Sequence, residues 1–131
     1  MTRATSVPTG YQSVSPYLIV ADVPALLDFL ATAFDAEEIN RNPRPDGTIA
    51  HAEARVGDSV VMMGQAAGEW TPVPTTLFLW VDDVDATYQR ALAAGATSLG
   101  GPEDKEYGDR MAGVQDPMGN RWWLGRPLEQ R

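Results

Sequence analysis

The stretch Tyr17–Phe34, YLIVADVPALLDFLATAF, is repeated in outline by Phe78–Gly95, FLWVDDVDATYQRALAAG. Each begins with apolar residues, passes an aspartate and continues as an alanine-rich amphipathic segment. Val20 and Val81, which match in the two stretches, stand 61 residues apart. An internal repeat is a stronger guide to architecture than the propensity of any one segment. The sequence therefore predicts two modules of the same design.

The same spacing of 61 residues relates Gly47 to Gly108 and Gly64 to Gly125, so the repeat extends well beyond the amphipathic segments. Residues 14–20 and 76–81 are rich in β-forming side chains and predict the first strand of each module. Asp22 and Asp83 are suitable N-caps for the helices that follow, and Pro24 is tolerated in the first turn of a helix. Turn residues then separate further short strands.

We therefore expect one α+β domain over residues 1–131, built from two tandem βαβββ modules that form a cup-shaped mixed sheet. Module one covers about 13–68 and module two about 76–127. Between them, residues 69–75 contain Pro72 and Pro74 and are expected to form a linker, because proline is poorly tolerated in a central strand.

Composition excludes several classes of function. The chain has 131 residues and a formal net charge of −8, so it repels nucleic acid and anionic membrane surfaces. No apolar stretch reaches the roughly 18 residues of a membrane span, and the start, MTRATSVPTG, lacks the apolar core of a secretory signal. With no cysteine, thiolate metal sites are excluded. We expect a cytoplasmic protein with neither nucleic acid nor membrane as a partner.

Two stretches, VDDVDATYQRALAAGA in the second half and YGDRMAGVQDPMGNRWWL near the end, resemble the glyoxalase/bleomycin resistance/dioxygenase superfamily, also called vicinal oxygen chelate. The second stretch is similar to the PhnB-like branch. The resemblance implies the cup-shaped fold and a two-fold homodimer, often with halves of different chains completing one cup. Activity does not follow, because this scaffold carries lyases, dioxygenases, transferases and pure binders.

Metal-dependent members of that superfamily take four ligands from the first and last strands of the two halves. The repeat places those positions at Ser15, Met62, Thr76 and Trp123. Divalent ions in such sites need imidazole or carboxylate donors, which none of these side chains supplies. We therefore expect neither a metal nor another cofactor.

His51 is the only histidine, and strand alternation places it on one face with Glu53 and Arg55. Read by the constant spacing, the matching positions of His51 and Glu53 in module two are Ala112 and Val114. Two interpretations stay open: a polar ladder on a partly wet face, or the lining of a ligand cavity. Proton transfer by His51 is a further hypothesis, since imidazole titrates near neutral pH in general.

Strand alternation also predicts a ring-lined concave face. Leu18 and Val20 are expected to pack on a helix, whereas the predicted ligand-binding residues lie on the opposite face: Ser15, Tyr17, His51, Glu53, Met62, Thr76, Phe78, Trp80, Arg121 and Trp123. Trp70 in the linker could close over the bound molecule. The alternative is that the rings are ordinary core packing.

Three functions follow from these patterns. The first is a metal-free homodimer that sequesters a planar aromatic natural product or drug, neutral or cationic, as antibiotic-resistance relatives do. The alternative is a glyoxalase-type lyase or isomerase that uses an unrecognised metal or acid–base chemistry of His51 and Glu53. A structural or regulatory role without a ligand is the third. No catalytic residue is assigned.

Overall fold

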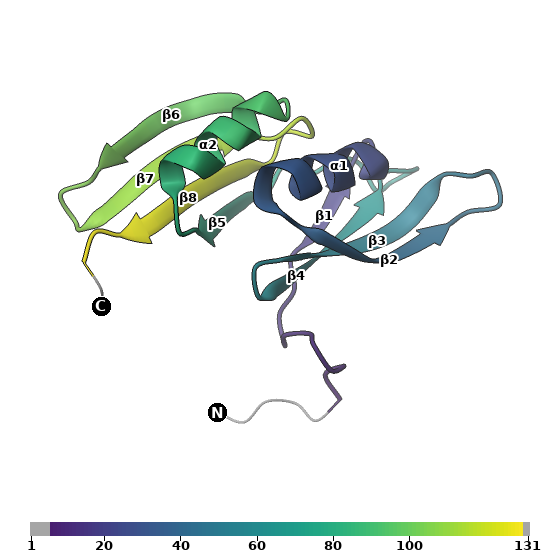
Figure 1. The fold of residues 1–131 in the computed structure, drawn as a ribbon. Coiled ribbons are helices and arrows are strands. Elements are labelled where there is room, and N and C mark those ends of the chain that lie inside the picture. The colour runs from purple at the N-terminus through teal and green to yellow at the C-terminus, as the bar shows by residue number, and fades with distance from the viewer. Residues whose placement is uncertain (1–5, 130–131) are drawn as a thin grey trace.

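The computed structural model describes residues 6–129, which form two modules with the same order of elements (Figure 1). Module one consists of β1 (Tyr17–Val20), α1 (Val23–Phe34), β2 (Glu37–Pro43), β3 (Ile49–Val56) and β4 (Ser59–Gln65). Module two consists of β5 (Thr76–Trp80), α2 (Val84–Ala93), β6 (Thr97–Asp104), β7 (Asp109–Gln115) and β8 (Arg121–Pro127). The predicted α+β fold of two βαβββ modules is confirmed.

Each module has its own four-stranded mixed sheet, in the order β1-β4-β3-β2 and β5-β8-β7-β6. The first and last strands of each module pair in parallel, with Tyr17 opposite Met62 in one sheet and Phe78 opposite Trp123 in the other. The spacing of 61 residues thus holds between both strand pairs. The two modules are separate sheets rather than one continuous cup.

Both helices begin where the aspartates predicted them. The side chain of Asp22 accepts a hydrogen bond from the backbone N–H of Ala25, and that of Asp83 accepts one from Ala86. These bonds satisfy amides that a helix start leaves without a partner. α1 lies over β3 and α2 over β7, and the two helices contact each other on the same side of the molecule (Figure 1).

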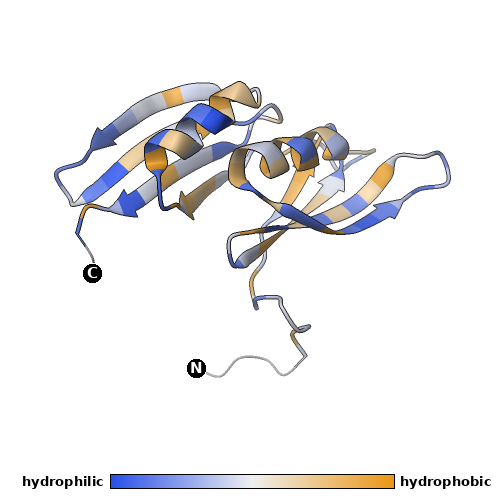
Figure 2. Cartoon of the chain, viewed as in Figure 1, coloured by the Kyte–Doolittle hydropathy of each residue, from blue (hydrophilic) through white to orange (hydrophobic). Residues whose placement is uncertain are grey.

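The core lies between each sheet and its helix. Leu18 and Val20 of β1 and Trp122 and Leu124 of β8 are buried there, whereas Tyr17 and Phe78 point to the opposite face. Hydrophobic and hydrophilic residues accordingly alternate along the strands (Figure 2). The predicted division of β1 and β5 into a helix face and an open face is confirmed.

The constant spacing fails inside β3, because a β-bulge there adds one residue. Asn42 pairs with His51 and Pro43 pairs with Ile49, so Ala50 has no partner in the register of β2. In the register with the last strands, His51 faces Gly64 as Met111 faces Gly125, and Glu53 faces Met62 as Gly113 faces Trp123. The predicted counterparts Ala112 and Val114 are therefore wrong, and the counterparts of His51 and Glu53 are Met111 and Gly113.

The segment before β1 runs along the open face of module one. Gln12 exchanges two hydrogen bonds with the backbone of Val60, and Arg55 donates to the carbonyl of Gly10. Because Val60 is fully buried although it points to the open face, this segment covers part of that face. The first five residues of the predicted non-signal start lie outside the described residues.

The linker between the modules carries a short turn in which Ala67 and Trp70 bridge each other. Trp70 is 65% exposed and borders the open face of module one. Within residues 6–129, neither helix is long and apolar enough to cross a membrane.

Candidate ligand sites on the open sheet faces

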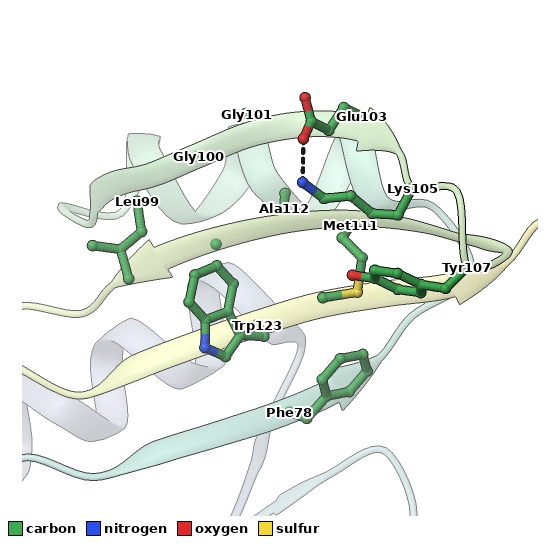
Figure 3. A pocket seen from close by; sticks show the side chains of 11 residues that line it. Phe78, Leu99, Gly100, Gly101, Glu103, Lys105, Tyr107, Met111, Ala112 and Trp123 are labelled. Carbon is green, nitrogen blue, oxygen red and sulfur yellow. Dashed lines mark hydrogen bonds and ion pairs between the residues drawn. The ribbon is translucent and has the colours of Figure 1, made fainter.

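The open face of module two holds a cavity of about 560 Å³. Its walls come from β5, β6, β7, β8 and the turn between β6 and β7 (Figure 3). Apolar side chains dominate: Phe78, Leu99, Tyr107, Met111 and Trp123. A volume of a few hundred cubic ångströms with mostly apolar walls is the usual form of a small-molecule site.

Two glycines make room for the rings of this cavity. A β-carbon at Gly113 would lie 2.3 Å from Cζ3 of Trp123, and one at Gly125 would lie 2.6 Å from Cζ of Phe78. Since such contacts are sterically forbidden, each ring lies flat against bare backbone. The indole points across β7, and the phenyl ring lies below Met111 and Tyr107 (Figure 3).

The rim of the cavity carries an ion pair between Glu103 and Lys105, and both side chains line the cavity. The ammonium beside Glu103 has its pKa raised, chiefly by the hydrogen bond to that carboxylate. Lys105 therefore stays charged at neutral pH and is in position to contact a bound molecule. The sequence suggested Asp104, Lys105 and Glu106 only as solvated turn residues.

Sequence reasoning had grouped Tyr17, Met62, Phe78, Trp80 and Trp123 in one hollow. Within one chain the structure places Tyr17 and Met62 on the sheet of module one, and the other three on the sheet of module two. Only Phe78 and Trp123 line the cavity of module two. Trp80 packs against Phe78, with ring centroids 4.6 Å apart, and faces a groove between the modules instead.

The remaining predicted residues flank these faces. Thr76 and Arg121 pair across β5 and β8 and are both exposed. Ser15 precedes β1 and is half-buried. Among residues 6–129, no three His, Asp or Glu side chains gather closely enough to hold a metal ion. The residues at the superfamily's ligand positions do not fit a divalent metal.

Module one carries polar groups on its open face. His51 lies between two partners: Nδ1 is 3.0 Å from the hydroxyl of Tyr17, and Nε2 is 2.8 Å from the carboxylate of Glu53. The hydroxyl of Tyr11 donates to the other oxygen of that carboxylate. The structure thus brings together Tyr17, His51 and Glu53 as one hydrogen-bonded group, and Tyr11 is an addition that sequence reasoning missed.

Glu53 is buried, with 6% of its surface exposed. Burial by itself raises the pKa of a carboxyl group, but the hydrogen bonds from Tyr11 and His51 outweigh that effect and hold the pKa of Glu53 below its ordinary value. Glu53 is therefore an anion at neutral pH. The hydrogen bond to this anion raises the pKa of Tyr11.

A second cavity, of about 380 Å³, lies on the open face of module one beside Tyr17. Its other lining residues are Ile19, Arg44, Ala50, Gly64, Gln65 and Trp70. A β-carbon at Gly64 would lie 2.9 Å from the Tyr17 hydroxyl, so this glycine makes room for the Tyr17 ring as Gly125 does for Phe78. Trp70 therefore borders a cavity, but one on module one.

Sequence reasoning missed Leu99, Tyr107 and Met111 in the larger cavity. Leu99 and Tyr107 belong to β6 and the turn after it, where two glycines and a proline hide the alternation of a strand. Met111 was missed because the bulge at Ala50 shifted the match between the modules by one residue. Its signal was the Met111–Gly113 alternation on a strand that pairs with Trp123.

Comparison with known proteins gives the same architecture. The family model of the Glyoxalase/Bleomycin resistance protein/Dioxygenase superfamily matches residues 11–124. The chain is 43% identical over 129 residues to an uncharacterized protein of Mycobacterium bovis, covering 90% of this chain and 85% of the relative. An uncharacterized protein of Mycobacterium tuberculosis is also 43% identical, over 90% of this chain and 76% of that protein.

Solved structures share the fold. TioX from Micromonospora sp. ML1 superimposes with a TM-score of 0.75 at 29% identity, covering 88% of this chain and 100% of that one. A gene product of Arabidopsis thaliana gives a TM-score of 0.72 at 20% identity over 88% and 99% of the two chains, which is a likeness of fold alone. With its two βαβββ sheets and the match over residues 11–124, the chain belongs to the glyoxalase/bleomycin resistance protein/dioxygenase superfamily.

Proposed function

We propose that this protein binds a flat aromatic small molecule on the open face of module two and sequesters it without turnover. The observation that carries the proposal is the 560 Å³ cavity between Phe78 and Trp123, closed at its end by Tyr107 and Met111. Ring stacking adds about 0.5–1.5 kcal/mol per pair beyond the burial of apolar area. Thioether sulfur also makes favourable contacts with rings. The site suits a planar conjugated guest.

The charge of the protein limits the class of ligand. With a net charge of −8, the chain attracts cationic and neutral molecules and repels anions at long range. The Glu103 carboxylate at the rim supports the same preference, although Lys105 neutralises part of it. This extends the resemblance to PhnB-like and antibiotic-binding superfamily members from the sequence to a ligand class: polycyclic aromatic compounds, neutral or cationic.

A homodimer is part of the proposal. Tyr17, Phe78 and Trp80 are 48%, 45% and 54% exposed, and all three lie on first strands that are sheet edges. Large exposed rings in a row are typical of a surface that another protein covers. A second copy of the chain, related by a two-fold axis, is the commonest occupant of such a surface. Light scattering is expected to give twice the mass of one chain, and Trp80→Glu to lower it towards one.

Calorimetric titration tests the ligand class with two matched probes, the cation 9-aminoacridinium and the anion 1-pyrenesulfonate. The cation is expected to bind more tightly. Trp123→Leu and Phe78→Leu each remove a stacking ring and are expected to weaken binding roughly two- to tenfold. Trp70→Leu, which removes an exposed indole on the other module, is the control and is expected to bind like the wild type.

Two results would end the proposal. One is that neither probe, nor a broader panel of uncharged polycyclic antibiotics, binds or raises the melting temperature of the wild type. The other is that binding survives Trp123→Leu but is lost in Trp70→Leu, because the ligand would then occupy module one. Consumption of the bound compound would replace sequestration with catalysis.

A further inference from the structure

Four side chains on the open face of module one form a continuous hydrogen-bonded relay. Starting from the surface, the Tyr17 hydroxyl meets Nδ1 of His51 at 3.0 Å, and Nε2 of His51 meets Glu53 at 2.8 Å. Tyr11 donates to the second oxygen of Glu53. Exposure falls along the relay, from 48% at Tyr17 to 6% at Glu53. One end is therefore open to a ligand and the other is held inside the protein.

Hydrogen-bond chemistry fixes the proton positions in the relay. An ionised carboxylate can only accept, so Nε2 of His51 must carry the proton that it shares with Glu53. In neutral histidine, Nδ1 is then the unprotonated nitrogen and accepts from the Tyr17 hydroxyl. The phenol proton of Tyr17 thus points to a base. Its oxygen keeps lone pairs directed away from His51 that can receive another proton.

The fold does not need this relay. In module two the positions of Tyr17, His51 and Glu53 are held by Phe78, Met111 and Gly113, which contain no titratable group. Phe78 nevertheless packs over its glycine as Tyr17 does over Gly64. A polar set that one module builds and its twin omits, at the same register, points to chemistry rather than to structural support.

The cavity beside Tyr17 sets the class of molecule that would meet this oxygen. Of about 380 Å³, it accommodates a small ligand rather than a polycyclic one. Arg44 brings a guanidinium to its wall, which is the side chain best suited to bind a carboxylate. Trp70 adds an indole face that can stack on a flat ring. Carboxylate, flat ring and an acidic hydrogen are the three features this cavity recognises.

We propose that the open face of module one is an acid–base site in which Tyr17 moves a proton of a small flat carboxylic acid that carries an enolisable carbonyl. The hydrogen on the carbon next to the carbonyl passes to the Tyr17 oxygen, while the hydroxyl proton of Tyr17 passes to Nδ1 of His51. The imidazolium so formed lies against the Glu53 anion. Tyr17 is the catalytic residue, and His51 and Glu53 are positioning residues.

The step balances without a further reactant. The electron pair of the broken C–H bond forms a carbon–carbon double bond, and the π pair of the carbonyl moves to its oxygen. Return of the proton from the relay to that oxygen gives the enol, and return to carbon regenerates the keto form. The overall reaction is a keto–enol tautomerisation, in which nothing is oxidised or reduced.

Deuterium exchange into phenylpyruvate provides the test. The methylene signal of this acid is followed by proton NMR in D₂O with and without the protein. General acid–base catalysis typically contributes about 10²–10⁴-fold, so the exchange rate at saturating phenylpyruvate is expected to exceed that in matched buffer about 100-fold. Phenylacetone, which has the same ring and carbonyl but no carboxylate, is expected to exchange at the buffer rate. Addition of EDTA is expected to change neither rate.

Variants assign the roles. Tyr17→Phe is expected to abolish the acceleration, since phenylalanine occupies the same position in module two without harm to the fold. Arg44→Gln is expected to raise the phenylpyruvate concentration that gives half-maximal rate, with less effect on the maximal rate. Trp123→Leu is the matched control in module two and is expected to retain full exchange. Because that variant weakens the proposed aromatic site, failure of either proposal is seen separately.

A second readout is independent of turnover. His51 is the only histidine, so a protein labelled with ¹⁵N-histidine gives one imidazole spectrum. We expect the tautomer with the proton on Nε2, and a change of the Nδ1 shift in Tyr17→Phe. Exchange at the buffer rate, exchange that survives Tyr17→Phe, exchange abolished by EDTA, or a proton on Nδ1 with Nε2 bare would each overturn the proposal.

Discussion

Trp123 lies so close to Gly113 that a β-carbon on that glycine would be 2.3 Å from Cζ3 of the indole. The ring therefore occupies space that every other residue type would claim. Gly113→Ala must displace Trp123 or bend β7, and overpacking of this kind typically costs about 1–3 kcal/mol. We expect the free energy of unfolding, measured with denaturant, to fall by that amount.

The matched control for this substitution is Gly100→Ala on β6. A β-carbon at Gly100 meets no atom within 4 Å, although this glycine borders the same cavity. It is expected to change the free energy of unfolding by no more than about 0.5 kcal/mol. Equal effects of the two substitutions would contradict the packing of Trp123 described here.

Gly64→Ala is expected to separate the Tyr17 ring from His51. A β-carbon there would lie 2.9 Å from the Tyr17 hydroxyl and 3.0 Å from Cε1. Because these atoms form the free end of a half-exposed side chain, the ring can swing away at small cost in stability. The His51 Nδ1 resonance of the ¹⁵N-labelled variant is expected to match that of Tyr17→Phe, and an unchanged resonance would mean that the hydrogen bond survives.

Asp116 stabilises the turn between β7 and β8. Its carboxylate, 3% exposed, accepts hydrogen bonds from the backbone of Met118 and Asn120, from the amide of Asn120 and from Nε1 of Trp122 at 2.9 Å. Asp116→Ala leaves buried donors without partners, at about 1–3 kcal/mol for each. A fall of at least about 2 kcal/mol in the free energy of unfolding is expected.

Asp58 in the corresponding turn of module one is the comparison. It is exposed and accepts from the hydroxyl of Ser59 at 3.1 Å. Asp58→Ala is expected to leave stability nearly unchanged, so a drop as large as that of Asp116→Ala would show that general turn propensity, rather than the buried hydrogen bonds, explains both results.

Acid is expected to weaken the protein through Glu53. The pKa of Glu53 in the folded protein lies below the ordinary value of 4.5, so the anion contributes stability above that pH and this contribution is lost as the pH falls through the lower, folded value. Glu53→Gln cannot titrate. The difference in melting temperature between wild type and Glu53→Gln should therefore shrink on acidification from about pH 6 to about pH 3, and a constant difference would disprove the assignment.

The internal repeat predicted much of this molecule. Asp22 and Asp83 cap the helices as expected, and Tyr17 and Phe78 face away from the core because strand alternation leaves no other choice. The pairing of Met62 and Trp123 with the first strands also follows from a constant spacing. These features depend on periodicity and local capping, which a sequence displays directly.

The sites were harder to predict, for physical reasons. A bulge is set by hydrogen bonding between strands and leaves no trace in an ungapped repeat, so Met111 and Gly113 were assigned to the wrong positions. The contact of Tyr11 with Glu53 depends on the path of a segment without regular structure. The division of the rings between two sheets depends on how the modules pack, which neither propensity nor alternation encodes.

The bulge at Ala50 also gives a route for redesign. Because it only moves the register of one strand by a residue, the two halves remain interchangeable scaffolds whose chemistry is decided by three side chains. Phe78→Tyr and Met111→His, together with Gly113→Glu and a smaller residue in place of Trp123, would transplant the acid–base set of the first half into the second. The molecule carries, within a single chain, both the finished site and the blank frame on which to rebuild it.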